Sequence, residues 1–212
     1  MKQNRILFLS PHTDDVELGC GGTIVKLLEQ KKEIHWVVFS IAEDSLPNEN
    51  DKLKLQKEFI SVTEELALKP DNYTIYRYPV RKLNFYRQEI LETLIKIKKE
   101  FNPELVFGPS QNDFHQDHQV ISNEMIRAFK MHCSILCYEL PWNHIKFTST
   151  YFVRLEERHI QMKLKILKKY ETQIKLNRYY FSDDMIKGLA MTRGAQINHK
   201  YAESFDVIRI LD

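Results

Sequence analysis

Short apolar segments alternate with amphipathic segments along most of this 212-residue chain, and that alternation limits its possible folds. A short apolar run bounded by turn residues predicts a buried strand, whereas apolar residues three or four positions apart predict a helix. We predict strands at 6–9, 34–41, 73–78, 105–107, 135–140 and, in part, 202–210. We predict helices at 19–30, 51–68, 88–101, 119–130 and about 156–176. This order predicts one α/β domain over residues 1–212, with a mostly parallel sheet covered by helices on both faces.

The composition argues against several classes of protein. Lys and Arg total 31 and Asp and Glu total 29, so the charge gives no general reason to bind nucleic acid or an anionic membrane. No apolar stretch is long enough for a membrane span, and the four apolar residues after Arg5 are too few for a signal peptide. The three cysteines, Cys20, Cys133 and Cys137, are too sparse for a disulfide framework, which favours a reducing, cytoplasmic location.

Two polar clusters follow predicted strands, at the edge where open parallel sheets place their chemistry. The first is Pro11-His12-Thr13-Asp14-Asp15, directly after the strand at 6–9. The second is Asp113-Phe114-His115-Gln116-Asp117-His118, shortly after the strand at 105–107. Because the carboxyl ends of parallel strands share one sheet edge, we expect the two clusters to meet there.

The residue types in these clusters suit a catalytic zinc site. Zn²⁺ binds His nitrogen and Asp oxygen, and a catalytic site uses three protein ligands and leaves one position open. His12, Asp15 and His118 can supply the three ligands. The remaining Asp14, His115 and Asp117 are then free for proton transfer.

Helix capping and nucleotide binding are alternative roles for this part of the sequence. Asp14 or Asp15, and likewise Asp117, could cap the helix that follows. The glycine-rich run at 19–23 could suggest a nucleotide-binding loop, but the glycine fingerprint needs a third glycine where Ile24 stands. We therefore expect these glycines to let the helix start pack closely against the loop that carries His12 and Asp15.

Residues 11–23 closely resemble the first signature of the PIG-L/LmbE family of zinc-dependent N-acetylglucosaminyl deacetylases, and residues 113–118 resemble its second. Weaker similarities extend the resemblance over nearly the whole chain. They lie at Glu43, Glu58, Thr172-Gln173, Arg193-Gly194 and 201–205. The resemblance implies a Rossmann-like fold and hydrolysis of the N-acetyl amide of a GlcNAc-type amino sugar or its conjugate.

The resemblance also implies roles for individual residues. His12, Asp15 and His118 match the zinc ligands, and Asp14 matches the general base. His115 matches the residue that stabilises the oxyanion or protonates the amine, with Asp117 as its partner. We expect Asp117 to hold His115 as an imidazolium, with a pKa above about 6.5.

Two positions depart from the family pattern. Thr13 replaces a proline. The stretch before Glu58, where the family often has an arginine, carries Lys52, Lys54 and Lys57.

Three further residues are candidates for contacts with the substrate: Asp113, Arg81 and Trp142. Arg81 and Lys82 precede aromatic residues and could bind a phosphate, although a solvated loop is the alternative. Trp142 could stack on a sugar ring, with ordinary packing as its alternative.

The leading hypothesis is a zinc hydrolase acting on a small N-acetyl sugar or sugar conjugate. The alternative is a non-catalytic, metal-bearing carbohydrate-binding or regulatory protein of the same fold. Intact Asp14 and His115 favour the enzyme, because a binding protein needs no free base and acid beside three ligands. The sequence leaves open which sugar is the substrate and whether the chain forms a homo-oligomer.

Overall fold

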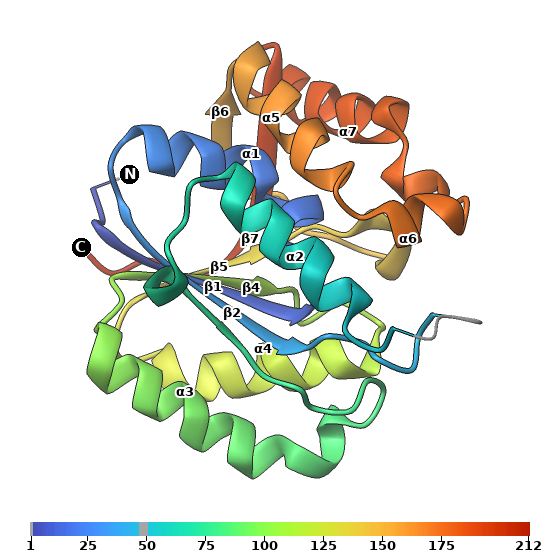
Figure 1. The fold of residues 1–212 in the computed structure, drawn as a ribbon. Helices are drawn as coiled ribbons and strands as arrows, with labels where there is room; N and C mark the ends of the chain where they lie inside the picture. The colour runs from blue at the N-terminus through green and yellow to red at the C-terminus, as the bar shows by residue number, and fades with distance from the viewer. Residues whose placement is uncertain (1, 47–50) are drawn as a thin grey trace.

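The computed structural model describes residues 2–46 and 51–212, in which a seven-stranded sheet lies between two layers of helices (Figure 1). The strand order is β3-β2-β1-β4-β5-β7-β6. The strands are β1 (Arg5–His12), β2 (Glu33–Ser40), β3 (Tyr73–Ile75), β4 (Leu105–Pro109), β5 (Ser134–Tyr138), β6 (Tyr151–Leu155) and β7 (Tyr201–Arg209). The first five are parallel, and β7 pairs antiparallel with both β5 and β6. The predicted α/β fold with a mostly parallel sheet is confirmed.

The helices cover both faces of the sheet. Figure 1 shows α3 (Arg87–Phe101) and α4 (Gln116–Phe129) on one face. The other face carries α1 (Asp15–Glu29), α2 (Lys54–Glu65), α5 (Glu157–Leu167), α6 (Glu171–Lys175) and α7 (Asp183–Ala195). Successive residues of β1 enter opposite cores: Ile6 and Phe8 pack on one face, and Leu7 and Leu9 on the other. Burial on both faces explains why these parallel strands are continuously apolar.

The C-terminal third differs most from the predicted elements. The single helix predicted at about 156–176 is wrong, because the chain turns between α5 and α6 at Tyr170. Tyr170 is fully buried there, and its hydroxyl contacts Glu17 and the backbone N–H of Asp14. Neither β6 nor α7 was predicted from the sequence, and the strand predicted at 73–78 ends at Ile75.

The glycines of α1 allow close packing, but against other elements than predicted. A Cβ atom on Gly19 would lie 2.7 Å from the ring of Tyr138 in β5, and one on Gly22 would lie 2.5 Å from Leu155 in β6. The backbone N–H of Gly22 donates to Glu203 of β7 at 2.9 Å. These glycines therefore bring α1 close to the sheet rather than to the loop with His12 and Asp15.

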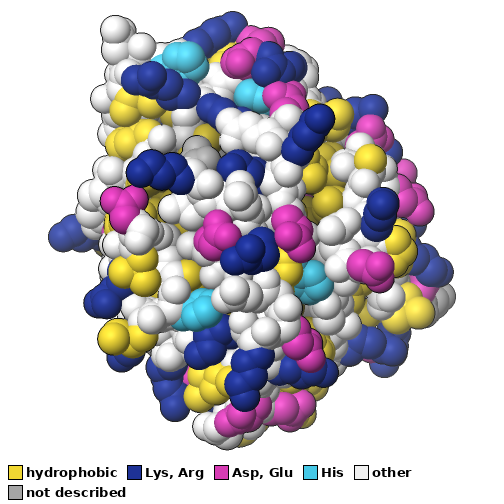
Figure 2. Space-filling model, turned by 90° about the vertical axis from the view of Figure 1, so that its left-hand side faces the viewer, with side chains coloured by type: hydrophobic (Ala, Val, Ile, Leu, Met, Phe, Trp, Pro, Cys, Tyr) yellow, Lys and Arg dark blue, Asp and Glu magenta, His cyan; other side chains and the backbone are white. Residues whose placement is uncertain are grey.

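Two features of the structure correspond to the composition of the sequence: the mixture of charges on the surface and the unpaired state of the three cysteines. Figure 2 shows the side of the molecule that carries the chain ends, where basic and acidic side chains are interspersed. Cys20, Cys133 and Cys137 are buried free thiols. Among the described residues, no helix is both long and apolar enough to cross a membrane.

We predict opposite stability effects for two Gly→Ala substitutions within helices. Gly19→Ala should lower the free energy of unfolding by about 1–3 kcal/mol, because Tyr138 is fully buried and has no room to move away from a new methyl group. Gly188→Ala in α7 should raise it by about 0.5–1 kcal/mol, because nothing lies within 4 Å of the added Cβ. Urea unfolding of both variants measures the difference. Equal effects would contradict the packing described for α1.

Candidate active site

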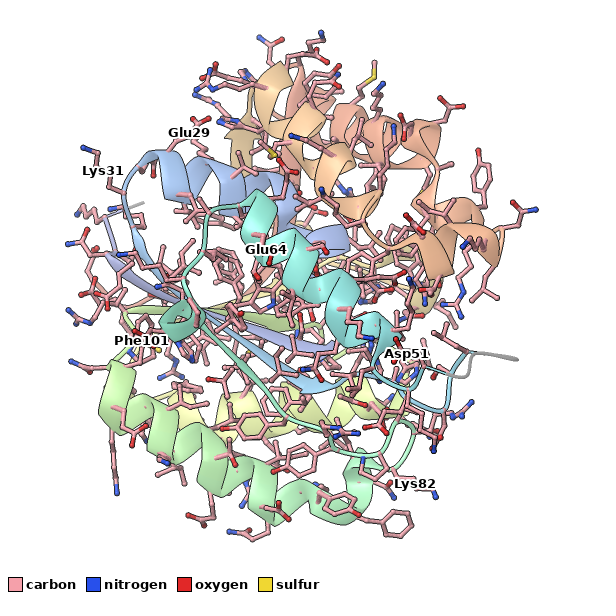
Figure 3. All side chains as sticks on the ribbon, in the orientation of Figure 1. Glu29, Lys31, Asp51, Glu64, Lys82 and Phe101 are labelled. Carbon is pink, nitrogen blue, oxygen red and sulfur yellow. The ribbon has the colours of Figure 1, made fainter. Side chains whose placement is uncertain are left out.

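A cavity of about 320 Å³ opens at the carboxyl edge of the sheet. In Figure 3 this edge lies on the right, where Asp51 precedes α2 and Lys82 precedes α3; Glu29 and Phe101 lie at the opposite edge. The cavity is lined by both polar clusters, with His12, Asp14 and Asp15 from the first and His115 and His118 from the second. The two clusters therefore meet at the sheet edge that was predicted from the positions of the strands. Arg81 and Trp142 also line the cavity.

Three atoms that could bind a metal ion form a nearly equilateral triangle at the cavity. The Nδ1 atom of His12 lies 3.3 Å from Oδ2 of Asp15 and 3.3 Å from Nε2 of His118. The third side, from Nε2 of His118 to Oδ2 of Asp15, measures 3.2 Å. All three residues are at least nine-tenths buried, and all three line the cavity.

A buried carboxylate holds the second ring nitrogen of each histidine in this triangle. The His12 Nε2–H donates to Asp117 Oδ2 at 2.9 Å, and the His118 Nδ1–H donates to Asp113 Oδ2 at 2.8 Å. When the rings are neutral, as metal binding requires, these bonds leave the lone pairs on Nδ1 of His12 and Nε2 of His118. Both lone pairs belong to atoms of the triangle.

These two carboxylates correct two expectations from the sequence. Asp117 was expected to bond the ring of His115, but its carboxylate bonds His12 instead. Asp113 was expected to contact the substrate, but it is buried behind His118, and its Oδ1 accepts the backbone N–H of His115 at 2.8 Å. Both residues therefore orient the histidines from outside the cavity.

Asp14 and Asp15 are neighbours in sequence but differ in environment. Asp15 Oδ2 accepts the backbone N–H of His12 at 2.8 Å. Its pKa is lowered because the imidazoles of His118 and His12 outweigh burial. Asp14 precedes α1 with a φ of 84°, a left-handed conformation that is uncommon outside glycine but tolerated by Asp. Its carboxylate has no hydrogen-bond partner among the described residues and lines the cavity.

Burial and nearby carboxylates together raise the pKa values of Asp14 and Glu17. Burial, Asp15 and Glu17 raise the pKa of Asp14 well above its ordinary value. Burial also raises the pKa of Glu17 to about 8, although a hydrogen bond from Tyr170 opposes that shift. A carboxylate with a raised pKa is a better proton acceptor near neutral pH.

His115 contradicts the expected imidazolium. Its Nδ1 accepts the backbone N–H of Asp117 at 3.2 Å, so the ring caps α4, which begins earlier than the predicted 119. Burial and the neighbouring His12 and His118 lower its pKa to about 4. The neutral ring carries its proton on Nε2, because Nδ1 accepts a hydrogen bond.

One wall of the cavity joins Trp142, a candidate from the sequence, to Tyr180 and Arg178, which no sequence pattern indicated. Trp142 stacks on Tyr180, with centroids 4.1 Å apart and planes 14° apart. The guanidinium of Arg178 donates to the Tyr180 hydroxyl at 2.6 Å. All three residues line the cavity. Trp142 therefore packs against the protein and also faces the cavity.

Glu58, one of the weaker similarities to the family, holds a helix beside the cavity. Glu58 is buried and accepts the backbone N–H of Thr172 at 3.0 Å, which fixes α6 beside the cavity-lining Gln173.

Lys57, at one of the positions that depart from the family pattern, pairs with Asp51 at 2.5 Å. None of the lysines before Glu58 lines the cavity, and Arg178 brings a guanidinium there from another element. The hydroxyl of Thr13 has no partner among the described residues.

The site offers enough donors to hold a metal ion. Ligand atoms of His12, His115 and His118 lie within 4.8 Å of one another. The triangle that uses Asp15 in place of His115 is tighter, and both histidines in it have carboxylate partners. Either set can hold a divalent ion beside the free carboxylate of Asp14.

Comparisons with known proteins place both clusters within the part of the chain that matches a protein family. The family model described as PIG-L, GlcNAc-PI de-N-acetylase, matches residues 7–129, a range that contains both. The chain is 25% identical over 176 residues to the uncharacterized deacetylase YaiS of Escherichia coli K12, and the match covers 81% of this chain and 92% of that relative.

Solved structures agree with the fold. The N,N'-diacetylchitobiose deacetylase of Pyrococcus horikoshii superposes with a TM-score of 0.78 at 20% identity, covering 98% of this chain and 84% of the other. GalB of Pseudomonas putida KT2440, a 4-carboxy-2-hydroxymuconate hydratase, superposes with a TM-score of 0.76 at 18% identity, covering 99% and 98%. Because this architecture occurs with different reactions, the assignment of an activity depends on the side chains.

We predict that two neighbouring histidines titrate far apart in the metal-free protein. Burial would lower the pKa of His118, but Asp15 and Asp113 outweigh it and raise this pKa to about 10. His118 should therefore stay protonated at pH 8, whereas His115, with its pKa of about 4, should already be neutral at pH 6. NMR titration of the imidazole resonances measures both values. A His115 pKa above 6.5 would restore the imidazolium expected from the sequence.

Proposed function

The chain belongs to the PIG-L family, and from this premise we propose that it is a zinc-dependent hydrolase that removes the acetyl group from an N-acetylated, GlcNAc-type amino sugar or its conjugate. The observation that carries the proposal is the triangle of His12, Asp15 and His118 beside the unpaired carboxylate of Asp14. The deacetylase relatives support the reaction class.

The triangle fits a tetrahedral zinc ion. Ligand bonds of about 2.0–2.1 Å at tetrahedral angles place neighbouring ligand atoms about 3.3–3.4 Å apart. The three measured sides are 3.2, 3.3 and 3.3 Å. We assign His12, Asp15 and His118 as the ligands rather than the three histidines, because the Asp15 set is more compact.

Zn²⁺ bound there would supply Lewis acidity toward the amide carbonyl and lower the pKa of a water molecule to about 7. Asp14 accepts the proton of the attacking water, because its carboxylate faces the cavity and has no other partner among the described residues. The water oxygen bonds to the carbonyl carbon, and Asp14 then passes the proton to the nitrogen as the C–N bond breaks. The products are acetate and the free amino sugar.

His115 stabilises the negative charge that develops on the former carbonyl oxygen. Its Nε2–H is free to donate, since Nδ1 is occupied by the backbone N–H of Asp117. A neutral donor already held in place needs no reorganisation during the reaction. This role replaces the imidazolium acid expected from the sequence, because the pKa of His115 is lowered to about 4.

The two adjacent aspartates should respond differently to the same substitution. Asp14→Asn should keep zinc but lose about 10²–10⁴-fold in kcat, the contribution of a general base. Asp15→Asn should lose zinc, because the amide that replaces a ligating carboxylate binds the ion poorly. Acetate release from N-acetylated sugars and metal content by mass spectrometry measure the two effects.

Histidine variants provide the controls for this pair. His12→Ala and His118→Ala should also lose zinc, whereas His115→Ala should retain it and lose activity. Zinc lost from Asp14→Asn but kept in Asp15→Asn would reverse the two assignments. Zinc binding by the unaltered protein without acetate release from any N-acetyl sugar would favour the alternative of a carbohydrate-binding or regulatory protein.

A further inference from the structure

The backbone at Asp14 departs from the usual start of a helix. Asp14 is the residue before α1, and its backbone oxygen accepts the N–H of Leu18 at 2.9 Å. An aspartate at this position usually turns its carboxylate back to accept a backbone N–H of the first helical turn. Here the carboxylate makes no such bond, and the φ of 84° lies in the left-handed region. Because both features cost stability, other groups must hold Asp14 in this conformation.

The hydroxyl of Tyr170 is the group that holds the backbone of Asp14. It accepts the N–H of Asp14 at 3.1 Å and donates its own proton to Oε1 of Glu17. A hydroxyl that donates to a carboxyl oxygen keeps its lone pairs for a second partner. The bond to Glu17 therefore orients the hydroxyl to accept from Asp14.

The burial of Glu17 is explained by this bond and not by a gain in stability. Glu17 and Tyr170 are both fully buried. Among residues 2–46 and 51–212, Oε2 of Glu17 has no hydrogen-bond partner. A buried carboxyl group with an unsatisfied oxygen lowers the stability of a fold, so such a group calls for a functional explanation. The effect of Glu17 on the hydroxyl of Tyr170 provides one.

Tyr170 is itself fixed by the segment that forms one wall of the cavity. Its backbone oxygen accepts the N–H of Gln173 at 3.1 Å, at the start of α6, and Gln173 lines the cavity. Its ring packs edge-on against Phe181, with centroids 6.3 Å apart. Residues 170–181 thus hold the hydroxyl at Asp14 by packing as well as by hydrogen bonds.

We propose that Tyr170, oriented by Glu17, is a positioning residue for the general base, because its hydroxyl holds Asp14 in the conformation that directs the carboxylate into the cavity. The inference rests on the proposed function, in which Asp14 accepts the proton of the attacking water. A general base must lie within hydrogen-bond reach of that water. An Asp14 released from the left-handed conformation would turn its carboxylate away.

Tyr170→Phe tests this inference, because it removes the hydroxyl and keeps the ring. On the zinc-loaded full chain with N-acetylglucosamine, kcat should fall about 10–100-fold, since the N–H of Asp14 loses its buried partner. KM should change less than about twofold, because Tyr170 does not line the cavity, and the zinc content should stay unchanged.

Tyr138→Phe is the matched control. Tyr138 is also fully buried, and its hydroxyl donates to the backbone oxygen of Leu9 at 3.1 Å, away from Asp14. Its kcat should stay within about twofold of that of the unaltered protein. An equal fall of kcat in the Tyr170 and Tyr138 variants would overturn the inference.

A double-mutant cycle shows whether Tyr170 acts through Asp14. In the Asp14→Asn background, Tyr170→Phe should lower the residual kcat less than about twofold, because the base is already lost. A fall as large as in the unaltered background would assign Tyr170 a general structural role and overturn the inference.

Hydrogen exchange of the backbone amide of Asp14 separates this inference from the proposed function, because it needs no turnover. The amide should exchange at least about tenfold faster in Tyr170→Phe than in the unaltered protein or in Tyr138→Phe. Faster exchange in a protein that releases no acetate would overturn the reaction and keep the anchoring of Asp14. An unchanged exchange rate would overturn the inference whatever the activity.

Discussion

The carboxylate of Asp117 joins three segments that are far apart in the sequence. Its Oδ2 accepts from His12 Nε2 at 2.9 Å and from the backbone N–H of Arg81 at 2.6 Å, and its Oδ1 accepts the backbone N–H of Leu83 at 3.2 Å. The end of β1, the loop before α3 and the start of α4 are thus held by one fully buried group. Loss of this carboxylate would leave buried donors unsatisfied, so the geometry of the cavity depends on it.

The division of work between Asp14 and Asp15 follows from the backbone between β1 and α1. The left-handed conformation of Asp14 lets two adjacent side chains diverge, one into the cavity and the other toward the two histidines. Such conformations are costly and persist where the surrounding structure holds them in place. Here the Tyr170 hydroxyl accepts the backbone N–H of Asp14, and Glu17 accepts the hydroxyl of Tyr170.

The position of the site was predictable because it depends on topology. Parallel strands β1 and β4 are neighbours, so residues that follow them must lie close together. The partner of Asp117 was not predictable, because Nδ1 of His115 caps the helix and the carboxylate of Asp117 turns toward a residue 105 positions away. Arg178 was also missed, since no local pattern distinguishes it among 31 Lys and Arg residues. The turn at Tyr170 depends on Glu17, which is 153 positions earlier.

A crystal structure of the zinc-loaded protein, with anomalous diffraction measured at the zinc absorption edge, tests the central assignment most directly. We expect one zinc peak bonded to Nδ1 of His12, Oδ2 of Asp15 and Nε2 of His118, with the carboxylate of Asp14 and the ring of His115 unbound beside it. A peak bonded to His12, His115 and His118, with Asp15 outside bonding distance, would contradict both the ligand set and the role proposed for His115.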